Sequence, residues 1–401
     1  MNIWIVNQYA DGPGGQATRD YDRAKVLVQR GHSVTIFSAG FSQYTLRDDR
    51  LKPGERYRTE RYDGVRFVWI KVPPYRRSDR RRAVNMVTFA WRAYWIARKF
   101  RGERPDVVIG TSVHPLTPIA AYFVARRQKS RFFFSVTDLW PQVLIDMGAI
   151  KEHSISAMLM RRIEHFSGKR AEKILCVLPG AADYFSNIGF PRSKIVCIPN
   201  GVDFEYFRTI KPFDGGTDFP LCFMYLGGHT PHHELDSILE AAKVLESEGE
   251  ARFNMVLVGS GVEKPRLIEK ARSLGLRVVE FRDPVPKQRL FETMGEADVL
   301  ICPQKPLSAH RFGLSLFKIP DYMASGRPII YAVRDPNDPV QAAHAGVSIE
   351  PGDAVAMAGA IRAMIELSPA QRIAMGRSGF QYALTMYDVN RHAEALEAAL
   401  T

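Results

Sequence analysis

The stretch "KPFDGGTDFPLCFMYLGG", residues 211 to 228, decides the fold, because one pattern ends in it and begins again. Its first ten residues contain two prolines and two glycines, a composition typical of a connecting segment. The apolar run that follows ends at two further glycines and is typical of a buried strand. The chain therefore starts a second series of structural elements after residue 220.

Short runs rich in Val, Ile and Phe lie on both sides of this connector and alternate with amphipathic stretches of helical length. Such continuous apolar runs are typical of parallel strands that are buried on both faces. The pattern predicts an α/β protein with two Rossmann-like, doubly wound parallel-sheet domains and ligands at the carboxyl ends of the strands. Strands are predicted at 1–7, 32–39, 65–72, 106–112, 131–136, 173–179, 194–200, 221–228, 252–261, 276–281, 297–303 and 327–333.

The length and composition agree with this organisation. A chain of 401 residues is too long for one ordinary core, and we place the domains at residues 1–205 and 206–401. The last helix is a candidate to pack back on the N-terminal domain. With 46% hydrophobic residues but no apolar window of membrane-spanning length, the sequence predicts a soluble protein. Its four cysteines are far apart and lack zinc or disulfide spacing, which favours a reducing, cytoplasmic setting.

The positive charge belongs to the first half of the chain. Residues 1–205 contain 34 Lys and Arg against 19 Asp and Glu, whereas residues 206–401 contain 21 against 24. Much of the excess lies in residues 75–101, where arginines alternate with tryptophan and tyrosine. This composition predicts a loop and helix facing an anionic membrane, with Trp91, Tyr94 or Trp95 at the headgroups. The alternative is that these aromatic side chains pack inward on their own sheet.

Two glycine-bearing segments each follow the first strand of a predicted domain. "DGPGGQATRD", residues 11 to 20, predicts that amides near Gly14 and Gly15 hold a phosphate, or else form only a tight strand-to-helix turn. "GGHTPHHELDSILEAA", residues 227 to 242, is the equivalent turn of the second domain. Its three histidines lack a cysteine or carboxylate to complete a ligand set, so no metal site is predicted.

Several longer motifs resemble a known family over nearly the whole chain. "IPNGVDFEYF" (198–207), "LVGSGVEKPRL" (257–267), "ADVLICP" (297–303) and "DYMASGRPII" (321–330) resemble landmarks of the retaining family 4 glycosyltransferases, which have the two-domain GT-B fold. "TDLWPQVLIDMGA" (137–149) is similar to a segment of the branch that builds bacterial surface polysaccharides and contains the fucosamine transferases. The resemblance therefore implies two Rossmann-like domains that face a cleft.

The resemblance also implies a donor site in the second domain. Asp321 matches the acid that holds the ribose hydroxyls, Ser315 is a candidate N-cap, and amides near Phe317 and Lys318 would face the diphosphate. The residues predicted to bind the donor are Gly14, Gly15, Gly228, His229, His233, Arg282, Ser315, Phe317, Lys318 and Asp321.

Two departures from the family pattern bear on this site. Gly313 stands where the family has a glutamate that contacts the donor sugar. The arginine and lysine that neutralise the leaving diphosphate correspond to Gly228 or His229 and to His233. We therefore expect Lys318, together with the histidines, to supply the missing charge and to act in catalysis.

The first domain is expected to serve the acceptor. Asp138 follows a strand and is predicted to orient or deprotonate an acceptor hydroxyl, or alternatively to cap a helix. His114 is a second acid–base candidate, with a satisfied loop histidine as the alternative. The resemblance implies a front-face reaction assisted by the leaving phosphate, with no protein nucleophile, metal or cofactor.

The sequence thus predicts a hexosyl- or N-acetylhexosaminyltransferase that uses a nucleotide sugar, UDP-linked by default. The expected acceptor is a lipid-linked glycan of lipopolysaccharide or O-antigen synthesis, reached by a peripheral protein on the inner face of the plasma membrane. One alternative is a GT-B nucleotide-sugar 2-epimerase. Another is a nucleotide- or nucleic-acid-binding protein, although Trp91 and Trp95 share a helical face that suits a membrane interface or a core better than base stacking.

Overall fold

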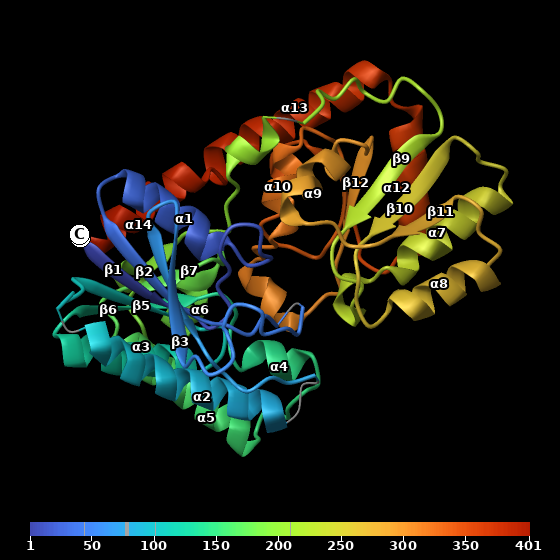
Figure 1. Ribbon diagram of the computed structural model, residues 1–401. Coiled ribbons are helices and arrows are strands. Elements are labelled where there is room, and N and C mark those ends of the chain that lie inside the picture. Colours follow the sequence, from blue (N-terminus) through green and yellow to red (C-terminus); the bar gives the residue numbers. More distant parts are fainter. Residues whose placement is uncertain (44, 77–79, 101, 209) are drawn as a thin grey trace. The chain divides into compact units, whose positions relative to one another are not determined.

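The chain divides into two compact units, Met1–Pro199 with Val389–Thr401, and Asn200–Asp388 (Figure 1). The computed structural model describes residues 1–43, 45–76, 80–100, 102–208 and 210–401, without the side chains of residues 287 and 288. The division falls before residue 200 rather than after 205. Asn200 and Val202 belong to the second unit because their amides bond to Ser315 Oγ (2.9 Å) and to the carbonyl of Tyr387 (2.7 Å).

The first unit contains an eight-stranded sheet with the order β3–β4–β2–β1–β5–β6–β7–β8. Neighbouring strands are parallel except for the antiparallel pair β3 and β4. The strands are β1 (Asn2–Val6), β2 (Ser33–Ala39), β3 (Tyr57–Tyr62), β4 (Val65–Ile70), β5 (Val107–Thr111), β6 (Arg131–Val136), β7 (Ile174–Cys176) and β8 (Ile195–Cys197).

Helices cover both faces of this sheet. The helices α2, α3 and α5 lie along one face, and α1 and α14 lie along the other (Figure 1). The layers between the sheet and these helices are apolar, and the side chains of Trp4, Phe67, Trp69 and Phe133 are almost fully buried. The helices of this unit are α1 (Arg19–Gln29), α2 (Arg80–Ala97), α3 (Leu116–Gln128), α4 (Gln142–Asp146), α5 (Ile155–Arg170), α6 (Ala181–Asn187) and α14 (Val389–Leu400).

The C-terminal helix α14 belongs to the first unit although its sequence follows the second. Val389, Ala393, Leu396 and Leu400 lie on one helical face and join the core beneath α1. Arg30 adds an ion pair to Glu397, with 2.6 Å between Nε and Oε2. The last turns of the chain are therefore part of the first unit's core.

The second unit has a six-stranded, all-parallel sheet with the order β11–β10–β9–β12–β13–β14. Its strands are β9 (Leu221–Leu226), β10 (Phe253–Val258), β11 (Val279–Arg282), β12 (Val299–Pro303), β13 (Ile329–Ala332) and β14 (Gly346–Ile349). Its helices are α7 (Asp236–Ser247), α8 (Lys264–Ser273), α9 (Lys287–Met294), α10 (Lys318–Ala324), α11 (Pro339–Ala342), α12 (Ala354–Glu366) and α13 (Pro369–Met386). Short 3-10 helices span Arg98–Phe100, Arg192–Lys194, Phe204–Phe207, Pro231–His233 and Ser308–Phe312.

The predicted fold class, two doubly wound parallel-sheet domains, is confirmed. Two strands were missed, and both lie at the edge of a sheet. β3 has the polar sequence "YRTERY" and contains no buried residue, while β14 has only four residues, none of them buried. Edge strands bury one side at most, so neither segment carries the apolar run that predicted the central strands.

Candidate active site

The candidate donor site lies in the second unit, at the carboxyl ends of β9 and β12. The sheet order reverses between these neighbours, because β10 and β11 extend from one side of β9 and β12 to β14 from the other. Ligands of doubly wound sheets bind at such a point. The loop after β9 carries Gly227 to His233, and the segment after β12 leads to Lys318 at the start of α10.

Lys318 is a partly buried cation that lies on an aromatic side chain. Its Nζ donates to Tyr225 OH at 3.1 Å and lies 4.5 Å from the centre of the same ring. Burial lowers the pKa of the Lys318 ammonium. No carboxylate of the described residues forms an ion pair with it. A Cβ atom on Gly227 would lie 3.1 Å from Nζ, so the glycine makes room for the ammonium.

Two histidines lie close to this ammonium. His229 is fully buried, and neither ring nitrogen has a hydrogen-bond partner among the residues that the structure describes. Burial, with the charges of Lys264 and Lys318, lowers the pKa of His229 to about 4. His233 bonds to Thr230 through Nδ1 (3.0 Å), and burial and Lys318 lower its pKa to about 3. Both rings are therefore neutral near pH 7. The structure thus brings together Gly228, His229, His233 and Lys318, as expected from the sequence.

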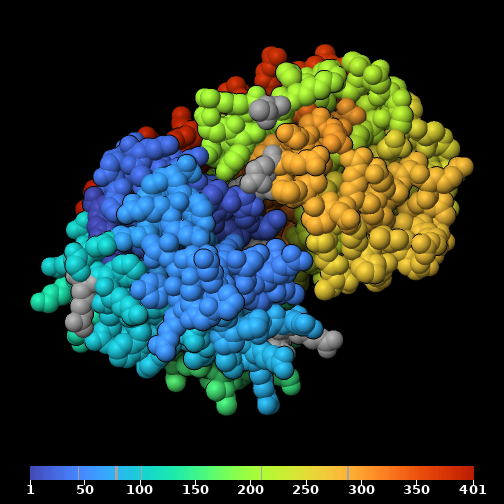
Figure 2. Space-filling model, in the orientation of Figure 1, coloured from blue at the N-terminus to red at the C-terminus, as the bar shows by residue number. Residues whose placement is uncertain are grey.

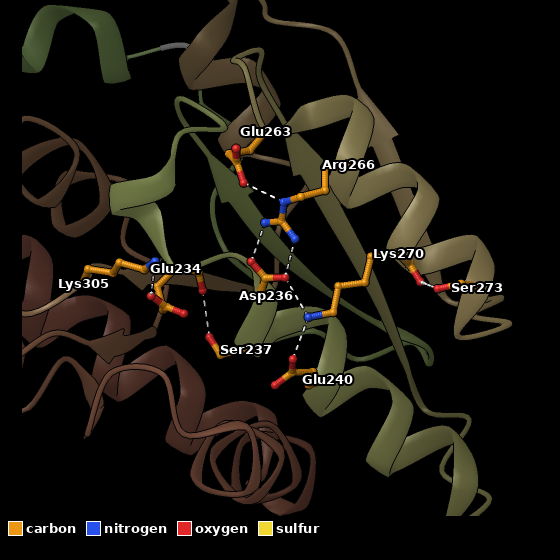
Figure 3. Close-up of polar contacts among 9 residues, drawn as sticks. All are labelled: Glu234, Asp236, Ser237, Glu240, Glu263, Arg266, Lys270, Ser273 and Lys305. Atoms are coloured by element: carbon orange, nitrogen blue, oxygen red, sulfur yellow. Dashed lines mark hydrogen bonds and ion pairs between the residues drawn. The ribbon is translucent and has the colours of Figure 1, made fainter.

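A network of ion pairs fixes the helix that follows the histidine loop (Figure 3). Asp236, in the first turn of α7, accepts from both guanidinium Nη atoms of Arg266 (2.6 and 2.8 Å) and from Lys270 Nζ (2.7 Å). These bonds hold the pKa of the Asp236 carboxyl well below its usual range, and the hydrogen bond from Arg266 has the largest effect. Lys270 also donates to Glu240 (2.6 Å). The network joins α7 to α8 and so supports the loop that carries the histidines.

The start of α10 differs from the prediction at one residue. Ser315 is not the N-cap, because its Oγ accepts from the Asn200 amide and its carbonyl from Asn200 Nδ2 (2.6 Å). Phe317 occupies the N-cap position with an exposed side chain. Asp321 lies in the first turn of α10, one turn after Lys318, and is partly buried. Ser315 therefore holds the chain that precedes the helix.

Arg282 is engaged away from this cluster. Its guanidinium bonds to Glu280 (2.8 and 3.0 Å) and to Glu296 (2.6 Å) on the outer strand β11 and the segment before β12. These hydrogen bonds raise the pKa of the Arg282 guanidinium, and the bond to Glu280 has the largest effect. Two carboxylates occupy the guanidinium in this structure, so the geometry gives no support for the predicted role of Arg282 in donor binding, which stays a prediction.

The glycine loop of the first unit forms a tight turn around Asp11. Asp11 Oδ2 accepts from the amides of Gln16 (3.0 Å) and Ala17 (3.2 Å), so these amides already face a carboxylate. A Cβ atom on Gly15 would lie 2.2 Å from Asp11 Cβ, which explains the glycine by packing. The geometry therefore supports the alternative of a strand-to-helix turn and gives no support for phosphate binding at Gly14 and Gly15.

Asp138 lies beside a small pocket of the first unit. Ser112, Trp140 and Glu164 line this pocket with it. Asp138 keeps an exposed surface, yet the protein packed around its carboxyl raises the pKa. Helix α4 begins at Gln142 with Pro141 as its N-cap, so the alternative of Asp138 as a capping residue was wrong.

His114 belongs to a buried hydrogen-bond network. Its Nδ1 accepts from the Leu116 amide (3.3 Å), so Nε2 carries the proton and donates to Gln8 Oε1 (2.5 Å). Burial lowers the pKa of His114 to about 3. The structure therefore supports the alternative of a satisfied loop histidine, because both nitrogens are used and the ring stays neutral.

Glu164, on α5, was missed by the sequence analysis. It is 7% exposed, accepts from Tyr184 OH (2.8 Å), and burial raises the pKa of its carboxyl to about 8. Its sequence context, "RRIEHF", resembles any charged helical surface, so no local signal marks it. The pocket therefore holds a carboxylic acid that is neutral at pH 7.

We expect Glu164→Gln to remove a pH dependence of stability. The folded pKa of about 8 lies above the unfolded value of 4.5, so this group's contribution is complete below 4.5 and is lost as pH rises toward 8. The glutamine keeps the acceptor for Tyr184 but never ionises. Thermal unfolding should show a variant that gains stability over wild type at pH 8 and not at pH 4.5. Parallel pH profiles of the two proteins would contradict the assignment.

Two family models match the chain, and together they cover most of it. One, described as a glycosyl transferase 4-like domain, matches residues 14–201. The other, described as glycosyl transferases group 1, matches residues 221–366. The chain is a family 4 glycosyltransferase with the GT-B fold. The family models favour this activity over the epimerase and the nucleic-acid-binding protein.

Solved structures of similar fold align with this glycosyltransferase over almost its full length. Sucrose-phosphate synthase from Thermosynechococcus elongatus covers 99% of the chain and 97% of its own, with TM-score 0.75 and 16% identity. HepE from Anabaena, in complex with UDP-glucose, aligns over 99% of this chain and 100% of its own length, with TM-score 0.69 and 13% identity. The lipopolysaccharide outer core galactosyltransferase WaaB aligns over 100% of this chain and 99% of its own length, with TM-score 0.61 and 14% identity. Among curated proteins, no match is found.

Proposed function

We propose that this glycosyltransferase moves a sugar from a UDP-sugar to a lipid-linked glycan, with retention of the anomeric configuration, in bacterial surface polysaccharide synthesis. The observation that carries the proposal is Lys318, a partly buried cation without a carboxylate partner among the described residues. Burying a cation is costly unless an anion accompanies it. The diphosphate of a nucleotide sugar supplies that anion, at the strand ends where such ligands bind.

The leaving diphosphate gains negative charge as the glycosidic bond breaks. Lys318 meets this charge directly, and the neutral rings of His229 and His233 add hydrogen-bond donors beside it. His229 is suited to this role because its ring nitrogens have no partner in the described protein. These residues replace the arginine and lysine of the family pattern, and the reaction proceeds without a metal or cofactor.

Asp321 is proposed to hold the ribose. A carboxylate accepts hydrogen bonds from both hydroxyls of a cis-diol, and Asp321 lies one helical turn from Lys318. Phosphate and ribose are adjacent parts of the same nucleotide, so the two residues are placed to bind it together.

We expect Asp321→Ala to weaken UDP binding by roughly 1.5 to 3 kcal/mol, because the ribose loses a charged acceptor. Isothermal titration of UDP into wild type and variant measures the difference. Asp218→Ala is the matched control, since it removes the same charge from an exposed position of the connector. Equal affinities of Asp321→Ala and wild type would refute the ribose assignment.

The fold similarity to HepE, which was solved in complex with UDP-glucose, supports the proposed donor. The similarity to WaaB, a lipopolysaccharide outer core galactosyltransferase, supports the proposed lipid-linked acceptor. On the acceptor side, Asp138 is proposed to orient the attacking hydroxyl, while the leaving phosphate assists its deprotonation. Hydrolysis of a panel of nucleotide sugars by the purified protein tests the donor. Addition of lipid-linked glycans from the cytoplasmic leaflet, followed by analysis of the product anomer, tests acceptor and retention. Turnover that no acceptor stimulates would contradict the transfer.

A further inference from the structure

Helix α2 presents an apolar stripe to solvent. Val84, Val87, Trp91 and Trp95 are 54%, 56%, 64% and 43% exposed, at spacings of three and four residues that place them on one helical face. The opposite face of α2, which includes Phe89 and Ile96, is buried in the first unit. The alternative in which the two tryptophans pack inward was therefore wrong. Figure 2 shows this segment, in light blue to cyan, at the surface of the first unit.

A second helix on the same face of the sheet carries a similar patch. Ile155, in the first turn of α5, is 81% exposed, and Met158 and Leu159 are about half exposed. Helix α3 packs between α2 and α5, touches both, and exposes Phe123. The three helices form one layer (Figure 1). The membrane-facing surface predicted from the sequence comprised only residues 75–101, so the structure adds α5 to it.

The charge of this layer has one sign. The helices α2, α3 and α5 contain ten Lys and Arg but a single acidic residue, Glu164, which is buried and protonated near pH 7. Arg98 continues the pattern beyond α2, 4.4 Å over the Trp95 ring. Arg76, Arg80 and Arg81 are exposed before and at the helix start, while Arg77 lies outside the described residues. An apolar surface with cationic neighbours is complementary to an anionic leaflet.

We propose that the layer of α2, α3 and α5 binds an anionic lipid surface, with Trp91, Trp95, Ile155 and Leu159 entering the headgroup region. None of the helices in the described part of the chain has the length and apolarity to cross a bilayer, so this contact is peripheral. A second copy of the chain is a poor occupant, because two such faces would oppose charges of the same sign. The biological reason for this binding rests on the proposed lipid-linked acceptor. The binding itself is argued from the apolar and charged residues of the surface alone.

Vesicle co-sedimentation tests the surface directly. Wild type should bind phosphatidylglycerol vesicles better than phosphatidylcholine vesicles, and rising salt should release it. Trp91→Ser with Trp95→Ser, and separately Ile155→Ser with Leu159→Ser, should each weaken binding by about tenfold or more. Arg126→Ser and Arg127→Ser, both at exposed positions of α3, should weaken it by about fivefold each.

The matched control is Val262→Ser with Val355→Ser, two valines of the second unit that are 79% and 73% exposed. It should bind vesicles like the wild type. Brominated lipid chains should quench wild-type tryptophan fluorescence and quench the Trp91 and Trp95 variant less, because Trp4 and Trp69 are buried in the core.

Each contrary outcome would overturn the inference. No preference for anionic vesicles at low salt contradicts the charge complementarity, and unaltered binding of the α5 variant contradicts a face built from both helices. If the tryptophan changes abolish a dimer formed without vesicles, the face is a contact between copies. UDP titration of the same proteins separates the two proposals. A protein that binds UDP but no vesicles contradicts only the docking face, and the reverse contradicts only the donor site.

Discussion

We expect Lys318→Ala to lower turnover by about 10²- to 10³-fold, equivalent to roughly 2.7 to 4 kcal/mol of transition-state stabilisation, while donor affinity falls less. The ammonium lies partly buried on Tyr225, where reduced solvation strengthens its interaction with the leaving diphosphate. That negative charge grows as the bond to the sugar breaks, so the interaction is stronger in the transition state than in the bound donor. Steady-state kinetics with a donor identified by hydrolysis measure kcat and KM separately.

Lys243→Ala is the control for this substitution, because Lys243 is an exposed lysine of α7 away from the strand ends. Its kinetics should match the wild type. If Lys318→Ala raised KM and left kcat unchanged, the ammonium would contribute uniform binding only. If neither constant changed, Lys318 would be an ordinary surface lysine and the donor site would lie elsewhere.

The resemblance to the family predicted this cluster, and the regular topology of a doubly wound sheet explains why its residues meet. β9 and β12 are neighbours, and the segments that follow them meet at the same edge of the sheet. The strands themselves were visible as continuous apolar runs. The family pattern supplied both the grouping of Lys318 with His229 and their expected chemistry, without knowledge of any side-chain contact.

The residues whose predicted roles find no support in the structure contact partners that a local motif does not reveal. Ser315 is held by Asn200, 115 positions earlier, and Arg282 by Glu296 as well as by its neighbour Glu280. Gly15 meets Asp11, a contact that only the folded loop creates. A local motif gives the residue types available for a role, but a competing partner decides whether the role is free, and that partner is set by tertiary packing.

The tryptophans of α2 show the same limit for surfaces. Their spacing placed Trp91 and Trp95 on one helical face, which the structure reproduces with ring centres 5.5 Å apart. Periodicity alone does not say whether an apolar face meets a core or a membrane, since both bury it. The structure excludes the core for this face, because the opposite face, with Phe89, already fills it. The exposed apolar patch of α5 was not predicted, because the sequence around it does not distinguish an exposed apolar patch from a buried helical face.

Buried arginines hold the connector at residues 211–220, and we expect Arg372→Met to destabilise the protein strongly. Arg372 is 1% exposed and donates to the carbonyls of Gly215 (2.6 Å), Gly216 (2.7 Å) and Met364 (2.9 Å). Gly215 has a φ of 90°, and a Cβ atom there would lie 2.5 Å from the Pro369 carbonyl oxygen, so only glycine fits where the connector meets the start of α13.

Methionine fills a volume similar to that of arginine but leaves these carbonyls without donors, which should cost about 3 to 5 kcal/mol of unfolding free energy. Urea unfolding at constant pH measures the loss. Arg377→Met, on the exposed face of the same helix α13, should change the free energy by less than about 0.5 kcal/mol. Arg372→Lys should fall between the two, because lysine keeps the charge but not the planar fork that reaches several carbonyls at once. Equal stabilities of the Arg372→Met and Arg377→Met proteins would mean that apolar packing alone holds residues 211–220 against the rest of the second unit, and that the buried guanidinium is dispensable.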